Sequence, residues 1–65
     1  SMKAGDLIVF KRAVFAQVAK YALIRYVHIT KSGTGQIGIY CSELPHATIP
    51  WADRDKYIEV VGEYR

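Results

Sequence analysis

Short runs of apolar, β-forming residues separated by turn residues dominate the chain. The segment GDLIVFKR opens with a turn pair and predicts a first strand over about residues 6–11. LIRYVHIT (residues 23–30) and QIGIYCS (residues 36–42) alternate between two faces and predict two further strands. YIEVVGEY (residues 57–64) predicts a closing strand. These patterns indicate a mainly β domain.

The segment between the two central strands predicts a hairpin bend. A phosphate-binding loop would need a Gly-Lys-Ser/Thr sequence running into a helix, but here Lys31 precedes the glycines and a strand follows. Gly33 and Gly35 suit a five-residue bend over residues 31–35. That bend would pair Val27 with Ile39, Ile29 with Ile37, Tyr26 with Tyr40 and His28 with Gly38. The residues expected to point inward are Leu23, Val27, Ile29, Ile37, Ile39 and Cys41. Those expected to point outward are Ile24, Tyr26, His28, Gly38 and Tyr40.

Three other segments have less regular patterns. AVFAQVAKYA (residues 13–22) fits a strand with a bulge, or a short helix. LPHATIPW (residues 44–51) predicts a loop, because Pro45 and Pro50 exclude a central strand. ADRDKY (residues 52–57) predicts one helical or 3-10 turn.

Both ends of the chain resemble a small SH3-like barrel. GDLIVF is similar to the first strand of such barrels, and ATIPWADRDKYIEVV to their end, where a proline-led turn precedes a short last strand. The resemblance implies a mainly β fold of about five strands with one short helical or 3-10 turn. The alternative is an α+β fold with a short helix near residues 13–22. Barrels of this kind bind RNA, DNA or peptides or serve as assembly adaptors, so the fold alone does not select a function.

Length and composition restrict the class of protein. The 65 residues suffice for a single domain, expected to cover residues 2–65 with Ser1 as a cloning scar. Cys41 is the only cysteine, which indicates a reducing, cytoplasmic location. No apolar run approaches the ~18 residues of a membrane span, so no membrane partner is expected. A hydrophobic content of 51% in so short a chain predicts some self-association.

Charge is distributed unevenly along the chain. Residues 1–35 hold six basic residues against one acidic residue, a net charge of +5. Residues 36–65 hold three basic residues against five acidic residues, a net charge of −2. A basic half of this kind attracts phosphate backbones or acidic protein surfaces.

The residues that could support catalysis or metal binding are few. Cys41, His28 and His46 are too few for a structural zinc site, and Asp53 and Asp55 fit a solvated turn. GQIGIYCSEL resembles a strand of the type II dihydrofolate reductases, which are small barrels acting as tetramers. The Val-Gln-Ile-Tyr stretch on which their active pore depends has no match after Ser42, where the later apolar run is YIEVV. We therefore expect no enzyme, no metal and no cofactor.

The predicted outer face of the hairpin is the candidate functional surface. Tyr26, Tyr40 and His28 would stand together there, with an open spot beside His28 at Gly38. The surrounding cations would be Arg12, Lys20, Arg25 and Lys31. Aromatic rings beside cations predict nucleic-acid binding without catalysis. The alternative is a protein-binding adaptor or inhibitor anchored by surface tyrosines and by Trp51, which fits either a lid over the core or an exposed anchor.

Overall fold

A single antiparallel sheet of five strands organises the described part of the chain. The computed structural model describes residues 2–11 and 17–64. Its strands are β1 (Asp6–Phe10), β2 (Tyr21–Ile29), β3 (Gly35–Tyr40), β4 (Thr48–Pro50) and β5 (Ile58–Glu63). A 3-10 turn, η1 (Trp51–Asp53), and a one-turn helix, α2 (Arg54–Tyr57), connect β4 to β5. The strand order is β4-β3-β2-β1-β5, so β4 and β5 are the two edges of an unclosed sheet. The mainly β prediction is confirmed.

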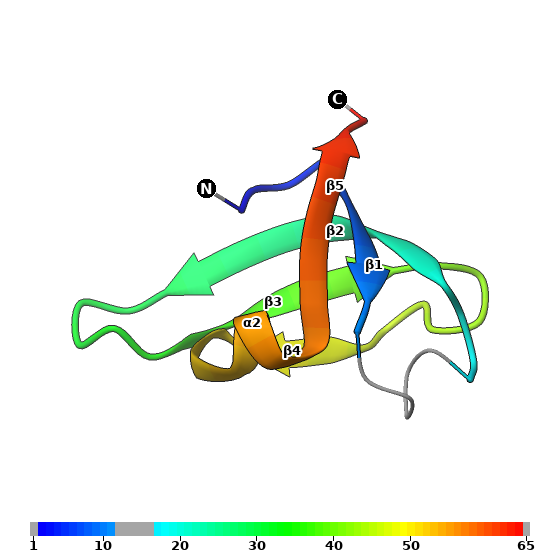
Figure 1. Ribbon diagram of the computed structural model, residues 1–65. Coiled ribbons are helices and arrows are strands. Elements are labelled where there is room, and N and C mark those ends of the chain that lie inside the picture. Colours follow the sequence, from blue (N-terminus) through cyan, green and yellow to red (C-terminus); the bar gives the residue numbers. More distant parts are fainter. Residues whose placement is uncertain (1, 12–16, 65) are drawn as a thin grey trace.

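The sheet is strongly bent, so that its two ends lie across one another. In Figure 1, β5 and β1 cross the direction of β3 and β4, while the long strand β2 connects the two halves. The β2–β3 hairpin extends beyond the rest of the molecule on one side (Figure 1). This bend gives the sheet an inner face, which encloses the core, and an outer face, which points away from it.

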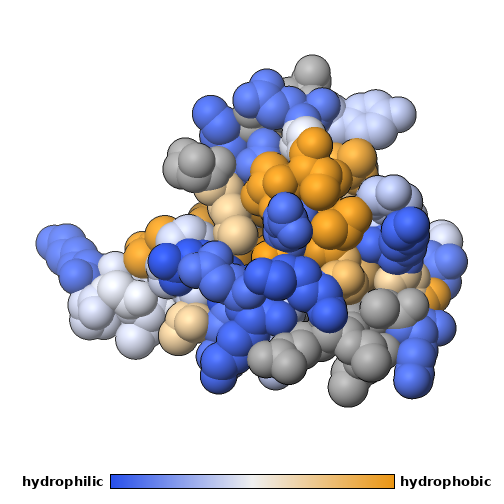
Figure 2. All heavy atoms as spheres, viewed as in Figure 1, coloured by the Kyte–Doolittle hydropathy of each residue, from blue (hydrophilic) through white to orange (hydrophobic). Residues whose placement is uncertain are grey.

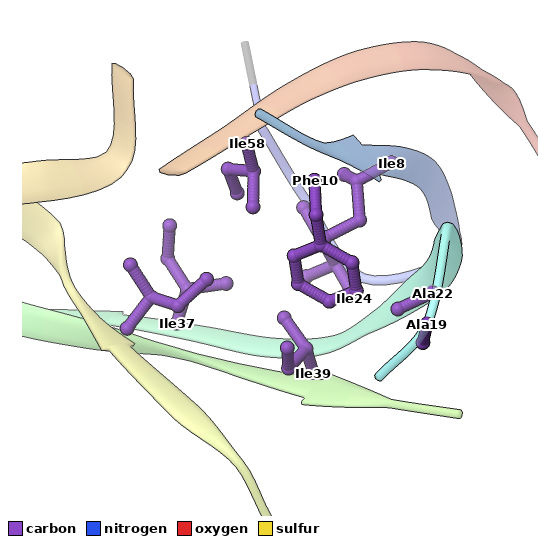
Figure 3. Packing of buried hydrophobic residues seen from close by; sticks show 9 residues of the cluster. Ile8, Phe10, Ala19, Ala22, Ile24, Ile37, Ile39 and Ile58 are labelled. Atoms are coloured by element: carbon purple, nitrogen blue, oxygen red, sulfur yellow. The ribbon is translucent and has the colours of Figure 1, made fainter. Parts of the chain in front are cut away.

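Isoleucines from all five strands form most of the core on the inner face. Figure 3 shows side chains of β1 and β5 pointing toward those of β2 and β3. The core isoleucines have exposed fractions between 0% and 2%; they are Ile8, Ile24, Ile37, Ile39, Ile49 and Ile58. Burying one such side chain contributes about 1.5–3 kcal/mol. Phe10, Ala19 and Ala22 complete the cluster.

The predicted strand pairing of the hairpin is wrong by two residues. Val27 pairs with Ile37, Tyr26 with Gly38 and His28 with Gln36. The bend is shorter than expected, because the Thr30 N–H donates to the Thr34 carbonyl at 2.7 Å and the Gly33 N–H donates to the Thr30 carbonyl at 3.0 Å. Gly33 takes a φ of +88°, as in three-residue hairpin loops that end in a left-handed residue. A two-residue shift preserves the faces, so Val27 still shares the inner face with Ile37 and Ile39. Ile29, predicted to point inward with them, is instead 47% exposed near the hairpin tip.

A bulge at Arg25 exchanges the faces of the residues before it. The pairing shifts between Tyr26, opposite Gly38, and Ile24, opposite Ile39. Since one extra residue reverses the alternation of a strand, Ile24 is buried at 2% exposure and Leu23 lies on the outer face opposite Tyr40. The prediction of Leu23 inward and Ile24 outward is therefore wrong.

The remaining strand predictions are partly confirmed. β1 and β5 lie where the sequence places the first and closing strands, and η1 with α2 confirms the helical or 3-10 turn. The loop predicted over residues 44–51 contains the edge strand β4, which tolerates Pro50 because it pairs only with β3. Within residues 13–22, positions 13–16 lie outside the described residues. Residues 17–20 form a turn and bend, and β2 begins at Tyr21, so the helix alternative is wrong for the described part.

Candidate functional site

The outer face of β1, β2 and β3 carries a shallow apolar hollow surrounded by tyrosines. Its volume is about 220 Å³ and it is lined by Leu7, Tyr21, Ala22, Leu23, Tyr40, Cys41 and Tyr64. Leu7 pairs with Leu23 and Leu23 with Tyr40, so three adjacent strands supply the centre of this surface. We call it the tyrosine hollow.

The three tyrosines of this hollow are largely exposed. Tyr21 is 50% exposed, Tyr40 45% and Tyr64 73%. Tyrosine suits such positions because the ring provides apolar contact area while the hydroxyl remains in water. The tyrosine hollow therefore combines accessible aromatic rings with an aliphatic floor of Leu7 and Leu23.

Two cations lie next to aromatic rings on β2 and the turn before it. The Lys20 ammonium lies 5.6 Å from the centroid of the Tyr21 ring. The Arg25 guanidinium lies 5.7 Å from the centroid of the Tyr26 ring. Both basic side chains are exposed, so their charges remain accessible to a ligand that contacts the rings.

Tyr26 fills the open spot that the sequence predicted beside His28. A Cβ atom added at Gly38 would collide with the Tyr26 ring, so that ring lies directly over the glycine. The Gln36 side-chain amide donates to the Tyr26 hydroxyl at 3.0 Å. Tyr26 thus covers a cross-strand glycine. His28 is exposed on the same face, opposite Gln36, nearer the hairpin tip.

The hairpin tip holds Lys31 and a group of hydroxyls. The Thr30 hydroxyl lies 2.9 Å from the Ser32 hydroxyl and 2.7 Å from the Thr34 hydroxyl. The tip is remote from the tyrosine hollow, because β2 spans about 26 Å from Tyr21 to Ile29 at ~3.3 Å per residue. Lys20, Arg25 and Lys31 are therefore spread along the hairpin. Arg12 lies outside the described residues.

Trp51 lies apart from the tyrosine hollow, beside the inner face. Its ring packs against the core and is half-buried. The Arg54 guanidinium lies 4.2 Å from the ring centroid and donates to the Trp51 carbonyl at 2.8 Å. Trp51 thus covers one end of the core and does not join the tyrosine hollow. His28 lies opposite Gln36 and Tyr40 lies opposite Leu23, so the two do not stand together as predicted.

A groove of about 610 Å³ adjoins Trp51, lined by Met2, Lys11, Trp51, Arg54, Asp55, Ile58, Glu59 and Val60. The Lys11 ammonium donates to the Asp55 carbonyl at 2.6 Å across this groove. Figure 2 shows hydrophobic atoms gathered around β5, where Val60 is 36% and Val61 49% exposed, above hydrophilic atoms around α2. Because the charged residues of the groove have both signs, it has no preference for a polyanion.

The charged side chains of the segment from residue 7 to residue 42 are all lysine or arginine. No aspartate or glutamate occurs between Asp6 and Glu43, a stretch that contains β2 and β3. Cations at Lys20, Arg25 and Lys31 therefore have no acidic partner from their own segment. The local field over the hairpin favours anionic ligands.

Sequence reasoning missed Tyr21 and Tyr64 as members of the surface. Tyr21 fell at the end of the ambiguous segment 13–22, so its face could not be assigned. Tyr64 lies just beyond β5, and its approach to the hollow depends on the pairing of β5 with β1. The acid-free stretch after Asp6 was a visible signal for the location of the site.

Comparison with known proteins identifies no relative. No family model, no curated protein and no solved structure matches this chain. Among the described residues, no helix has the length and apolarity needed to cross a bilayer. In the same part of the chain, no three His, Cys, Asp or Glu side chains come together as metal ligands would.

Proposed function

We propose that this domain is a non-enzymatic nucleic-acid-binding module that holds a single strand against the outer face of β2 and β3. The observation that carries the proposal is the conjunction of exposed Tyr21 and Tyr40 with the cations of an acid-free segment. Stacking of a base on an aromatic ring is worth about 1–3 kcal/mol, and basic side chains hold the phosphates.

The direction of the hairpin supports an extended ligand. Lys20, Arg25 and Lys31 follow one another along β2 and the bend after it, over a span of about 30 Å. A strand laid along the hairpin would contact these cations in turn while its bases reach Tyr21 and Tyr40. No catalytic step is required, and Cys41, beyond the end of β3, is far along the hairpin from His28, which lies opposite Gln36.

We also propose a finer fold class, an SH3-like barrel, and a reducing, cytoplasmic location. The strand order β5-β1-β2-β3-β4 and the helical turn between β4 and β5 are the features in favour of the barrel. The free thiol of Cys41 is the feature in favour of the location.

Fluorescence titration with a short single-stranded DNA or RNA at two salt concentrations tests the function. Lys20→Ala or Lys31→Ala should lower the slope of log affinity against log salt by about 0.7 per lost phosphate contact. Lys56→Ala, which makes the same charge change on α2, is the matched control and should leave the slope unchanged. Absence of binding at low salt and about 100 μM protein would exclude the proposal.

The same titration of variants that lack the tyrosine rings tests whether bases stack on them. Tyr21→Ala with Tyr40→Ala should weaken binding by about 1–3 kcal/mol per lost stack. Tyr21→Phe with Tyr40→Phe keeps both rings and should retain most of the affinity.

A protein-binding adaptor is the second candidate, favoured by the aliphatic floor of the tyrosine hollow. Tyrosine rings around a small apolar depression are typical of the energetic centres of protein interfaces. Such a contact would depend weakly on salt, whereas phosphate contacts weaken steeply with it.

A further inference from the structure

We propose that the tyrosine hollow receives one unstacked base of the bound strand, with Tyr64 as its closing wall, so that the domain selects single strands over duplex. The inference rests on the proposed function and adds to it a defined subsite and a basis for selectivity. Tyr64 has no part in the sequence-based prediction of the site.

The shape and lining of the hollow fit the faces of a base. Leu7 and Leu23 form a floor on adjacent, hydrogen-bonded strands, so its position is fixed by the sheet. Tyr21 and Tyr40 stand at its sides with half of their surface exposed. A planar base presents two apolar faces, which pack against aliphatic and aromatic side chains while its polar edge remains in water.

Tyr64 has a fixed backbone and a free side chain. Its N–H donates to the Gly5 carbonyl at 2.8 Å, which extends the β1–β5 pairing by one step. Its side chain is 73% exposed, the highest value among the large apolar residues that the structure describes as exposed. A ring with so few packing contacts can rotate about its two side-chain torsions and cover a ligand in the hollow at low entropic cost.

The basic side chains beside the hollow favour an occupant that carries phosphates. The hollow adjoins Lys20, whose ammonium lies 5.6 Å from the Tyr21 ring. The acid-free stretch from residue 7 to residue 42 supplies β2 and β3, which form most of its surroundings. A phosphate next to the inserted base would therefore meet a cation, whereas an acid-rich groove would repel it.

Selectivity for single strands follows from the need to unstack the base that enters the hollow. Bases in a duplex are stacked and paired, so extruding one breaks its stacking and pairing contacts. A flexible single strand presents its bases without most of that cost. The hollow should therefore favour a single strand over the duplex of the same sequence by about 10- to 100-fold.

Three measurements on the whole chain test this inference, using a twelve-nucleotide DNA as a single strand, the same DNA as a duplex, and single strands carrying one abasic position. Tyr64→Ala should weaken single-strand binding by about 5- to 150-fold and leave duplex binding unchanged. Tyr64→Phe, the matched control, keeps the ring and should retain the affinity. An abasic position in the register of the hollow should reproduce the loss caused by Tyr64→Ala.

Each of the other outcomes rejects a different part of the proposal. Equal affinity for strand and duplex, with no effect of Tyr64→Ala, would reject the base subsite while the nucleic-acid function stands. No binding to any of these DNAs or their RNA equivalents would reject both. Salt-insensitive dimerisation in light scattering that Tyr64→Ala abolishes would show that the hollow is occupied by a second copy of the chain.

Discussion

The two faces of the same sheet differ in how far their side chains are exposed to water. On the inner face the six core isoleucines are at most 2% exposed, whereas on the outer face Tyr21, Tyr40 and Tyr64 are between 45% and 73% exposed. Successive residues of one strand contribute to both, as Ile39 and Tyr40 show on β3. The fold therefore uses one face for stability and leaves the other accessible.

The difference lies in the polar atom of tyrosine. Isoleucine has no polar group, so complete burial costs nothing in lost hydrogen bonds and a β-branched side chain packs well on a sheet. A tyrosine hydroxyl needs a partner or water, and on the outer face water can provide it. An apolar surface of tyrosines can thus stay exposed until a ligand covers it.

Substitution of adjacent residues on β3 gives the largest predicted contrast. Ile39→Asp places an unpaired charge in the core and should abolish the folded state, while Ile39→Ala should cost about 2–5 kcal/mol. Tyr40→Asp, one residue further, should cost about 1 kcal/mol or less, because its site is solvated. Thermal unfolding followed by circular dichroism measures all three, and equal losses for the two aspartates would show that the faces are wrongly assigned.

The effect of Gly38→Ala on the free energy of unfolding should change sign when the Tyr26 ring is removed. Gly38→Ala drives a methyl group into the Tyr26 ring and should cost about 1–3 kcal/mol. In a Tyr26→Ala background the same substitution should stabilise by about 0.5–1 kcal/mol, because alanine is preferred to glycine within a strand. Urea unfolding of the four proteins measures this coupling. Additive effects would mean that the ring does not lie over the glycine.

Truncation of the outer-face tyrosines should have small effects on folding. Tyr21→Ala and Tyr40→Ala should each change the free energy of unfolding by about 0.2–1 kcal/mol, the range of a cross-strand pair. Chemical denaturation of the ligand-free protein provides this value. A loss comparable to that of Ile39→Ala would place these rings in the core and remove them from the accessible surface.

The smallest predicted effect concerns Glu43, the first carboxylate after the acid-free stretch. Its own backbone N–H and the Ser42 hydroxyl, which donates at 2.9 Å, hold the pKa of Glu43 below its ordinary value of 4.5. A lowered pKa adds stability above the ordinary value, and this contribution is lost as pH falls through the folded value.

Ser42→Ala should therefore raise the pKa of Glu43 part of the way toward 4.5, since the bond to the backbone N–H remains. Titration of the side-chain carboxyl by NMR measures the midpoint. Ser32→Ala, at the hairpin tip, is the control and should leave the midpoint unchanged; an identical midpoint in the Ser42 variant would contradict the assigned cause.

Local sequence patterns were enough to predict the mainly β class, the first and closing strands, the helical turn before β5 and the hairpin. These features follow from local patterns: β-branched runs, turn residues and glycines near a bend. The inward direction of Val27, Ile37 and Ile39 was also predictable, because a shift of two residues preserves the alternation of a strand. The outward direction of Tyr40 was predictable for the same reason.

The pairing register, the exchange of Leu23 and Ile24, and the set of residues around the tyrosine hollow could not be predicted locally and follow from the folded sheet. A three-residue and a five-residue bend satisfy the same alternation, and a bulge at Arg25 leaves no local signal. Tyr64 joins Tyr21 and Tyr40 through strand pairings between distant parts of the chain. The physical reason is that side-chain direction is set by one residue and its neighbours, whereas a surface formed from three strands depends on how all of them pair around the core.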